Sequence, residues 1–380
     1  MDFTLTAEQQ DLQKMVREFA EAEIRPHVME WDEQQDFPTS ILKSLGQLGV
    51  LGIVFPESLG GAEMGYIEYA IVMEELARVD PSIALSVAAH ISLATAHIYM
   101  HGSKALKERY VPKLATGEWI GCWSLTEPEA GSDAAGTRTR AVLDGDEWVI
   151  NGGKTFTTNA QRADICVATA VTDPRLGTHG ISAFAIEIGT PGFRVGRKEN
   201  KLGMRASDTS EVLFEDCRIP KGNRIGKKGA GFVGAMKILD GGRVSISALG
   251  VGLAQGAFEA SLAYSKERRQ FGKRISEFQA IQHKLTDMVT EIEAARLLTF
   301  RAAWMLDQGQ HVTKESSIAK LFSSEMAVRV ANEGVQVFGG YGFTKDYPVE
   351  KYYRDVKLLT IGEGTSEIQR MVIARQILKA

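Results

Sequence analysis

One acidic residue near the end of the chain has the surroundings of a catalytic group. Glu363 lies between Gly362 and Gly364, and glycine neighbours let the backbone turn sharply and approach a ligand closely. Ser366 and Gln369 follow at the spacing of a helix capping box, ahead of a helical pattern of apolar residues. We therefore expect Glu363 on a tight loop just before a helix. A solvated carboxylate between two helix caps would show the same pattern.

Two polar segments in the middle of the chain could hold a ligand. Residues 125–133 carry the hydroxyls of Thr126 and Ser132, and Gly131 would let backbone N–H groups form an anion-binding turn. Residues 154–159 place an aromatic ring beside hydroxyl and amide groups, which suits a planar ligand with polar edges. A polar β-turn and an ordinary strand end are the structural alternatives.

Three further clusters call for an explanation. Residues 267–274 form a basic cluster between two helices, in which Arg268 could bind phosphate and a solvated helix end is the alternative. Residues 336–343 form a glycine-rich aromatic turn after a helix. Residues 240–243 place two glycines inside an otherwise helical run, and such glycines have a packing or functional reason.

Two patterns that look like known sites are better explained by packing. Residues 250–256 are rich in glycine but lack the spacing and the preceding strand of a dinucleotide-binding fingerprint, so we expect close helix packing there. His90, His97 and His101 share a helical face without an acidic partner at ligand spacing, and we interpret them as core or interface histidines. The sequence predicts no metal site.

Length and composition limit the class of protein. The 380 residues suggest two or three domains with ample core. Contents of 44% hydrophobic and 24% charged residues are typical of a globular protein. A net charge of −4 and a pI near 6.1 indicate no bulk attraction to nucleic acid or to an anionic membrane. We therefore expect no nucleic-acid partner.

The cysteines and the first residues bear on the compartment. Cys122, Cys166 and Cys217 are scattered and too few for a disulfide framework, which fits a reducing compartment. The polar, acidic N-terminus resembles neither a signal peptide nor a transit peptide. No apolar run is long enough to span a membrane, so we expect no membrane insertion. A cytoplasmic, bacterial-type protein is expected, with a processed mitochondrial matrix form as the alternative.

The elements that must position these residues change in type twice along the chain. Helical periodicity covers residues 1–118, apolar alternation covers residues 122–226, and helical periodicity returns after residue 231. The expected helices cover residues 6–19, 38–49, 66–79, 83–100, 232–268, 276–308 and 313–337. The expected strands cover residues 147–150, 163–170, 181–188 and 211–214, with turns at 144–145 and 151–153.

This order of elements predicts an α+β multidomain protein. We expect an N-terminal helical domain over residues 1–120, a middle antiparallel β domain over residues 121–230 and a C-terminal four-helix-bundle domain over residues 231–380. Long helices with short breaks are typical of an antiparallel bundle.

Six motifs along the whole chain resemble those of the acyl-CoA dehydrogenase family. They are Leu-Thr-Glu-Pro-x-Ala-Gly-Ser-Asp, Lys-x-Phe-x-Thr-Asn, Asp-x-Gly-Arg, Glu-Arg-x-Gln-Phe-Gly-Lys, Gln-Val-Phe-Gly-Gly-x-Gly and Glu-Gly-Thr-Ser-Glu-Ile-Gln-Arg. Any one motif is modest, but the set in this order is specific. The resemblance implies the same three domains, with FAD between the β domain and the bundle.

The resemblance also implies which residues bind the cofactor. Phe156 stands where many members have Trp, and it still offers an aromatic face to the isoalloxazine. Some expected contacts would reach the FAD of a neighbouring subunit, which implies a homo-oligomer, usually a tetramer in this family. The expected cofactor-binding residues are Trp123, Leu125, Thr126, Gly131, Ser132, Phe156, Thr158, Arg268, Gln270, Phe271, Gln279, Gln336, Val337, Gly339, Gly340, Thr365 and Glu367.

By the same resemblance, Glu363 is the catalytic base. It would remove the Cα proton of an acyl-CoA thioester while hydride passes from Cβ to flavin N5, giving a trans-2-enoyl-CoA. Because a free Glu has a pKa of ~4.3, burial would have to raise the pKa to roughly 6–7 for efficient catalysis. The residues expected to contact the substrate are Ser132, Asp240, Arg243 and Gly364.

The resemblance further implies the reaction partners and leaves alternatives open. Electrons would leave through electron transfer flavoprotein, in acyl-CoA metabolism such as fatty acid β-oxidation, and the acyl group would be short or branched. An oxidase that passes electrons to oxygen is the alternative within the fold. A non-catalytic relative that binds nucleic acid or partner proteins is an alternative of another class, which the intact Glu363 loop and the acidic pI disfavour.

Two positions depart from common family patterns. Some members place the base immediately before the arginine matched by Arg243, but this chain has Gly242 there, which leaves Glu363 as the candidate. Many members carry Tyr immediately before the base, where this chain has Gly362. We hypothesise that the missing ring widens the mouth of the acyl pocket and admits branched or cyclic chains.

Overall fold

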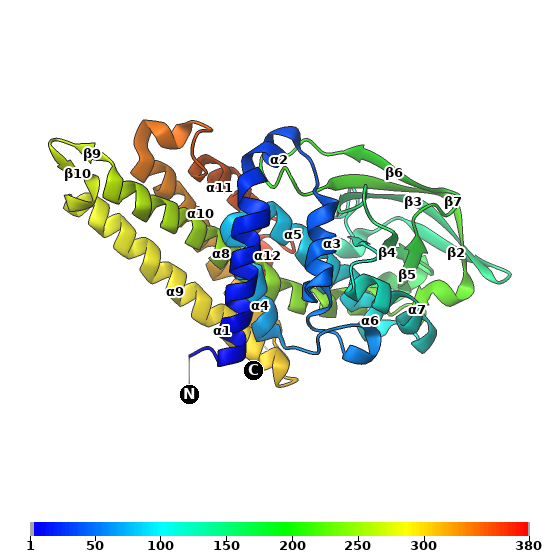
Figure 1. Ribbon diagram of the computed structural model, residues 1–380. Coiled ribbons are helices and arrows are strands. Elements are labelled where there is room, and N and C mark those ends of the chain that lie inside the picture. The colour runs from blue at the N-terminus through cyan, green and yellow to red at the C-terminus, as the bar shows by residue number, and fades with distance from the viewer. Residues whose placement is uncertain (1–3, 379–380) are drawn as a thin grey trace.

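The structure, a computed structural model, describes residues 4–378 and follows the predicted order of helices, strands and helices. In Figure 1 the sheet occupies one end of the molecule, and the long C-terminal helices extend to the other end. The predicted fold class, with helices first, then strands and then helices, is confirmed. One detail differs, because the sheet is mixed rather than purely antiparallel.

The N-terminal helices carry the capping signals that the sequence predicts. The hydroxyl of Thr6 accepts the N–H of Gln9, whose side chain returns the bond to the backbone of Thr6. The stretch expected as one helix over residues 83–100 consists of α5, a π-helical segment at Ala89–Thr95 and α6. The helices are α1 (Ala7–Phe19), α2 (Val28–Gln34), α3 (Thr39–Gln47), α4 (Tyr66–Val79), α5 (Pro81–Ala88), α6 (Ala96–His101) and α7 (Lys104–Ala115).

The middle of the chain forms an eight-stranded sheet in the order β6-β7-β3-β2-β4-β5-β8, with β1 paired to β4. Both β1 and β2 run parallel to β4, while the other pairs are antiparallel. The long excursion between β1 and β4 supplies the crossover that parallel strands need. The strands are β1 (Gly121–Ser124), β2 (Arg140–Asp144), β3 (Glu147–Thr158), β4 (Ile165–Val171), β5 (Ile181–Glu187), β6 (Phe193–Lys198), β7 (Thr209–Pro220) and β8 (Arg224–Ile225).

The turn predicted at residues 151–153 is wrong, whereas the one at Asp144-Gly145 is confirmed as the β2–β3 hairpin. Strand β3 continues through residues 151–153 with a bulge, because its register with β7 shifts between Ile150 and Gly152. A second shift follows residue 154, and Phe156 lies in it with a φ of 55°. Bulges re-aim side chains, and Phe156 is 62% exposed.

The C-terminal region packs three long helices with α12 and with α4 of the N-terminal region. A Cβ at Gly252 or Gly256 would overlap the main chain of α4, so the predicted close helix packing over residues 250–256 is confirmed. The basic cluster forms a small hairpin rather than a helix end. The elements are α8 (Gly231–Glu267), β9 (Arg269–Gln270), β10 (Lys273–Arg274), α9 (Gln279–Asp307), α10 (Thr313–Phe338), α11 (Val349–Asp355) and α12 (Ser366–Ile377).

Two helical stretches are longer and more apolar than the sequence analysis allowed. Pro81–His101 and Gly231–Glu267 pass the length and composition expected of a membrane span. However, 83% and 67% of their most apolar windows are buried inside the protein. A helix that is hydrophobic all round occupies either a membrane or a large core, and this burial identifies both stretches as core helices.

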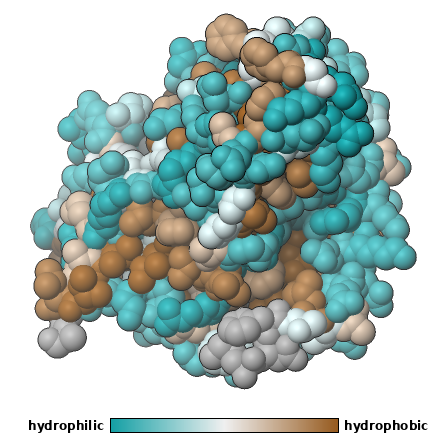
Figure 2. All heavy atoms as spheres, turned by 90° about the vertical axis from the view of Figure 1, so that its left-hand side faces the viewer, coloured by the Kyte–Doolittle hydropathy of each residue, from teal (hydrophilic) through white to brown (hydrophobic). Residues whose placement is uncertain are grey.

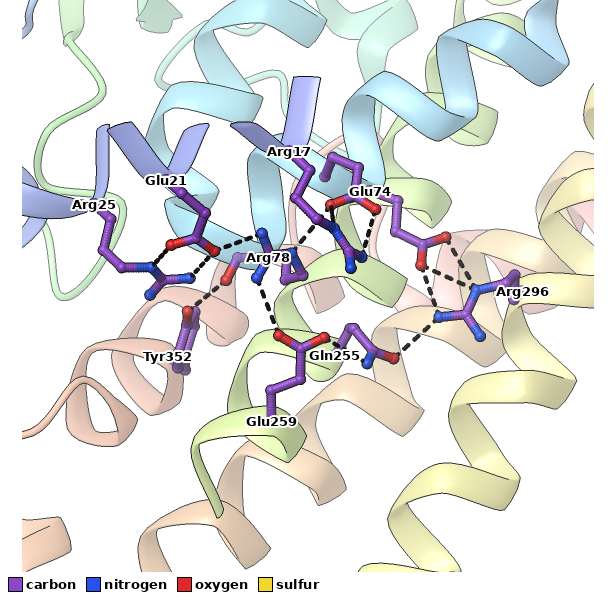
Figure 3. Close-up of polar contacts among 10 residues, drawn as sticks. Arg17, Glu21, Arg25, Glu74, Arg78, Gln255, Glu259, Arg296 and Tyr352 are labelled. Carbon is purple, nitrogen blue, oxygen red and sulfur yellow. Dashed lines mark hydrogen bonds and ion pairs between the residues drawn. The ribbon is translucent and has the colours of Figure 1, made fainter. Parts of the chain in front are cut away.

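A network of ion pairs joins the two helical regions around α4 (Figure 3). Arg78 of α4 donates to Glu21 at 2.6 Å, to Glu259 of α8 at 3.0 Å and to Glu75 at 3.1 Å. Arg296 of α9 reaches the same helix from the other side. Buried charges are tolerated when they are paired in this way, so the network fixes α4 against α8 and α9.

Candidate active site

The loop that carries Glu363 has an uncommon backbone conformation. Glu363 has a φ of 52°, and Gly364 follows at 93°. Gln369, the fourth residue of α12, donates from Nε2 to the carbonyl oxygens of both residues at 3.1 and 3.0 Å. A side chain in the left-handed region persists only where its surroundings hold it. The start of α12 therefore fixes the direction of the Glu363 side chain.

The predicted capping box of α12 is wrong by one residue. Thr365 is the N-cap, and its hydroxyl accepts the N–H of Ile368 at 3.3 Å. Ser366 is the first helical residue and is buried. Because Gln369 is not needed at the cap, its amide turns back to the catalytic loop instead.

One oxygen of the Glu363 carboxylate is withdrawn from solvent, although the residue as a whole is half-buried. Its Oε2 is buried and has no hydrogen-bond partner among the residues that the structure describes. Burial raises the pKa of Glu363 to about 7, while the charges of Lys320 and Arg243 limit the rise. The buried Oε2 does not fit the alternative of a freely solvated carboxylate. A carboxylate with this pKa is suited to accept a proton near neutral pH.

The two glycines inside α8 lie against this carboxylate. A Cβ at Gly242 would overlap the carboxylate of Glu363 and touch Leu93. A Cβ at Gly241 would come within 3.3 Å of the hydroxyl oxygen of Tyr66. The glycine pair therefore makes room for the Glu363 carboxylate and for the ring of Tyr66. This explains why two glycines occur inside a helix.

Arg243 and Asp240 form an ion pair on the same helix. Nη1 of Arg243 donates to Oδ1 of Asp240 at 2.7 Å, and the hydroxyl of Thr313 donates to the other carboxylate oxygen at 2.6 Å. The guanidinium is buried, and its Nε has no partner in the described part of the chain. The Nε–H of Arg243 is therefore a donor that a ligand could use.

Two tyrosines of α4 line the site and were missed by the sequence analysis. The hydroxyl of Tyr69 is buried beside the hydroxyls of Ser92 and Ser245. Burial raises the pKa of Tyr69 above its ordinary value, and the nearby charge of Glu363 adds to the rise. Burial also raises the pKa of Tyr66 to about 12. At three residues apart, both look like ordinary apolar positions of a helix, so no local signal marks them.

A second group of predicted residues gathers on β1, β3 and the loop between residues 125 and 133. The N–H of Thr155 donates to the carbonyl of Thr126 at 2.9 Å, which joins the loop to β3. The backbone N–H groups of Thr126, Gly131 and Ser132 have no acceptor within the described chain. Trp123 is half-buried and Phe156 exposed on the same sheet. The remaining members of this group are Leu125 and Thr158, both half-buried.

A buried ion pair holds this loop in place. Nζ of Lys154 donates to Oε1 of Glu127 at 2.8 Å and to the carbonyl of Leu125 at 3.1 Å. Burial alone would raise the pKa of Glu127, but the charge and hydrogen bond of Lys154 bring the pKa down to about 2. Both residues belong to motifs of the sequence analysis, which did not assign either of them. Their contact ties the two motifs together.

The predicted interpretation of the histidines is supported by their hydrogen bonds. Nδ1 of His90 accepts the N–H of Gly121 at 3.0 Å, and Nδ1 of His97 accepts Nε1–H of Trp123 at 3.0 Å. Within residues 4–378, no group of three or more His, Cys, Asp or Glu side chains could hold a metal ion. The histidines that make these hydrogen bonds are core residues, as expected.

A third group of predicted residues lies far from the sheet. Arg268, Gln270, Val337, Gly339 and Gly340 line a cavity of about 520 Å³ at the end of α8 and α10. This end lies opposite the sheet in Figure 1, so one chain does not bring the group to the residues of β1 and β3. Phe271 is 92% exposed at the hairpin. The other predicted residues of this region, Gln279 and Gln336, are exposed, while Thr365 is half-buried and Glu367 exposed at the start of α12.

Comparison with known protein families identifies the class of protein. The acyl-CoA dehydrogenase N-terminal, middle and C-terminal domains match residues 6–118, 122–217 and 229–378. A probable acyl-CoA dehydrogenase of Bacillus subtilis is 49% identical, and a short-chain specific acyl-CoA dehydrogenase of Clostridium acetobutylicum is 48% identical, each over the full length of both chains. The chain belongs to the acyl-CoA dehydrogenase family.

Solved structures agree with this placement. The butyryl-CoA dehydrogenase of Megasphaera elsdenii has a TM-score of 0.98 and 42% identity, with both chains covered completely. A chain from work on the electron transferring flavoprotein of Acidaminococcus fermentans and flavin-based electron bifurcation has a TM-score of 0.99 and 44% identity, again over both whole chains. PigA with FAD and proline has a TM-score of 0.95 and 34% identity over both whole chains.

Proposed function

We propose that this protein dehydrogenates a short or branched acyl-CoA to the trans-2-enoyl-CoA and passes the electrons to electron transfer flavoprotein. The buried Glu363 carboxylate, facing the glycine pair of α8, carries the proposal. Relatives that act on short acyl-CoA thioesters, and the similarity to a chain studied with electron transferring flavoprotein, support the substrate class and the acceptor.

The residues present fit FAD as the cofactor. An exposed aromatic ring at Phe156, a half-buried Trp123 and free backbone N–H groups in the neighbouring loop suit a flat apolar ring with polar edges. Bound FAD would supply the acceptor for the hydride that leaves Cβ. PigA, a structural relative, was solved with FAD.

In this proposal the residues of the chain orient the thioester and move its proton. Glu363 removes the Cα proton onto its carboxylate, which becomes a neutral acid. The backbone N–H of Glu363 has no acceptor among the described residues, so it is free to donate to the thioester oxygen, where negative charge develops. Arg243, Asp240, Ser132 and Gly364 would contact the substrate, and the tyrosine rings of α4 would shorten the acyl pocket.

The variant Glu363→Gln tests the assignment of the base. We expect this variant to bind FAD as the wild type does and to lose at least ~10³-fold in kcat, because an amide cannot accept the Cα proton. The measurement is anaerobic bleaching of the oxidised flavin band by butyryl-CoA. Glu118→Gln, at an exposed position outside the predicted site residues, is the matched control for the carboxylate-to-amide change. A Glu363→Gln enzyme with most of its activity would contradict the assignment.

The electron acceptor needs its own measurement. Reduced enzyme is mixed with air or with electron transfer flavoprotein, and reoxidation is followed by absorbance. We expect slow reoxidation in air and fast reoxidation by the flavoprotein. Fast reoxidation in air would favour the oxidase alternative instead.

We also propose a homotetramer in which cofactor sites are shared between subunits. Figure 2 shows hydrophobic side chains gathered across the face on the left-hand side of Figure 1, where α9 and the β9–β10 hairpin lie. Exposed apolar patches of this kind mark association surfaces. Large hydrophobic residues exposed on α9, α12 and the neighbouring turns are Phe271, Leu297, Trp304, Phe343 and Met371.

Domain boundaries and location complete the proposal. We propose domains over residues 1–120, 121–230 and 231–380, which the three family matches and the order of elements support. A cytoplasmic location is proposed, with the processed mitochondrial form as the alternative. The free, buried state of Cys122, Cys166 and Cys217 supports a reducing compartment.

A further inference from the structure

A buried lysine on α10 touches the loop of the proposed base. Lys320 has 0% exposure, and its Nζ donates to the carbonyl oxygen of Gly364 at 2.7 Å. Lysine is almost never fully buried unless its charge is paired. Within residues 4–378, however, Lys320 makes no ion pair. Its position therefore calls for an explanation other than a structural salt bridge.

The hydrogen bond of Lys320 completes a clamp on the loop. The Gly364 carbonyl also accepts Nε2–H of Gln369 at 3.0 Å, so side chains of α10 and α12 hold one carbonyl oxygen. The Glu363 carbonyl is held by the same amide at 3.1 Å. These hydrogen bonds hold the carbonyls of Glu363 and Gly364 against α10 and α12. The backbone of Glu363 therefore keeps its positive φ, and its side chain stays directed at α8.

Lys320 lies among other charged groups near the base without forming a close ion pair among the described residues. The charges of Lys320 on α10 and Arg243 on α8 act on the Glu363 carboxylate, and Glu363 acts on Tyr69 of α4. Asp240 on α8 acts on Arg243, and Glu367 on α12 acts on Lys320. The positive charge of Arg243 is paired with Asp240 at 2.7 Å. Lys320 instead donates to a neutral carbonyl, so its charge acts on the carboxylate.

We propose that Lys320 is a positioning residue for Glu363, which clamps the base loop through Gly364 and stabilises the ionised carboxylate before substrate binds. This inference rests on the proposed function, because it assigns Lys320 a role toward the proposed base. Burial lowers the pKa of Lys320 to about 8, so the side chain is still charged at neutral pH. Of the causes acting on Glu363, burial raises its pKa most, and Lys320 is the larger of the opposing charges.

The test is the pH profile of kcat/KM for butyryl-CoA, measured with FAD-loaded wild type, Lys320→Met and Lys320→Gln. Both variants remove the charge, and Lys320→Gln keeps an N–H donor. Removing a nearby positive charge raises the pKa of a carboxylate, typically by ~1 unit or more. We therefore expect the acid limb of the profile, where kcat/KM falls as the pH is lowered, to move to higher pH by ~1 unit. At pH 6 the kcat/KM of each neutral variant should be about tenfold below that of the wild type, and above the limb the difference should disappear. Lys320→Arg should restore the wild-type limb.

A matched control separates this role from a general loss of charge on α10. Lys314→Met removes a lysine from the exposed start of the same helix, where the side chain pairs with Glu315, and it should leave the limb in place. The infrared band of the protonated Glu363 carboxyl group is assigned by its loss in Glu363→Gln. The pH at which this band appears should move by the same amount as the acid limb.

Three outcomes would overturn the inference or its basis, and they can be told apart. An unshifted acid limb in Lys320→Met with normal FAD content would contradict the inference while leaving the proposed function intact. Failure of both neutral variants to fold would assign Lys320 to the core and also contradict it. A wild-type protein that oxidises no acyl-CoA would contradict the proposed function itself.

Discussion

At the scale of single residues, the site depends on one carboxylate and on the absence of side chains around it. Gly242 leaves room for the carboxylate of Glu363, and Gly362 lacks the ring that many family members carry. A Cβ at Gly362 would meet only Leu358, at an ordinary distance of 3.5 Å. The position therefore has space for a larger residue, unlike Gly242.

The acid limb of the wild-type pH profile is the first prediction at this scale. Because burial raises the pKa of Glu363 to about 7, the base is protonated and inactive below that pH and ionised above it. We expect kcat/KM for butyryl-CoA to fall about tenfold for each pH unit below the limb. A limb near pH 4.5 would show that the carboxylate is solvated in the working enzyme.

Substitution of Gly362 tests the width of the acyl pocket. We expect Gly362→Tyr to reduce kcat/KM for isobutyryl-CoA and cyclohexanecarboxyl-CoA about tenfold more than for butyryl-CoA, because steric overlap of this kind costs ~1–3 kcal/mol. Steady-state kinetics with the three thioesters measure the effect. Equal effects on branched and linear substrates would show that the missing ring does not set selectivity.

At the scale of elements, buried polar contacts hold the ligand-binding loops to the sheet and to the bundle. The Lys154–Glu127 pair fixes residues 125–133 on β3, with side chains only 0% and 6% exposed. Two bulges in β3 then present Phe156 to solvent. The strands thereby hold residues 125–133 and Phe156, which belong to the predicted flavin site.

Removal of Lys154 should destabilise the middle region. We expect Lys154→Met to lower the free energy of unfolding by ~3–5 kcal/mol, because it leaves Glu127 buried without its counter-charge. Arg138→Met, which breaks the exposed ion pair with Glu129, is the control and should cost less than ~1 kcal/mol. Urea unfolding of both variants, with FAD content measured in parallel, compares them. Equal stabilities would show that the buried pair contributes nothing.

At the scale of the whole molecule, the predicted cofactor contacts form two groups at opposite ends of one chain. The cavity lined by Arg268 and Gly340 lies beyond the long helices, away from β1 and β3 (Figure 1). If both groups bind one FAD, as we propose, a second copy of the chain has to supply one of them. The proposed tetramer supplies such copies, since a symmetric oligomer repeats each interface.

Complementation tests this sharing. Glu363→Gln and Arg268→Met chains, carrying different tags, are co-expressed and the mixed oligomers are purified. If Arg268 acts on the neighbouring subunit's site, about one quarter of the sites in a random mixture receive both intact residues. We therefore expect about a quarter of wild-type activity, although each variant alone is nearly inactive. Mixed oligomers without activity would place Arg268 and Glu363 in the same chain's site.

Sequence alone determined the family, the order of helices and strands and the loop of Glu363. These features are local, because periodicity, capping residues and short motifs depend on neighbours within a few positions. The same local reasoning placed the α12 cap one residue late and took a bulge in β3 for a turn. In both cases tertiary contacts decided between conformations that the residues allow equally.

Tertiary structure alone decided what surrounds the carboxylate. Tyr69, Gly242 and Lys320 are more than forty residues from Glu363 in the sequence, and each comes from a different helix. Their effects on the pKa and on the space at the site arise from burial and charge, which no single segment carries. The helices that pack around the loop thus turn an ordinary glutamate into a candidate base.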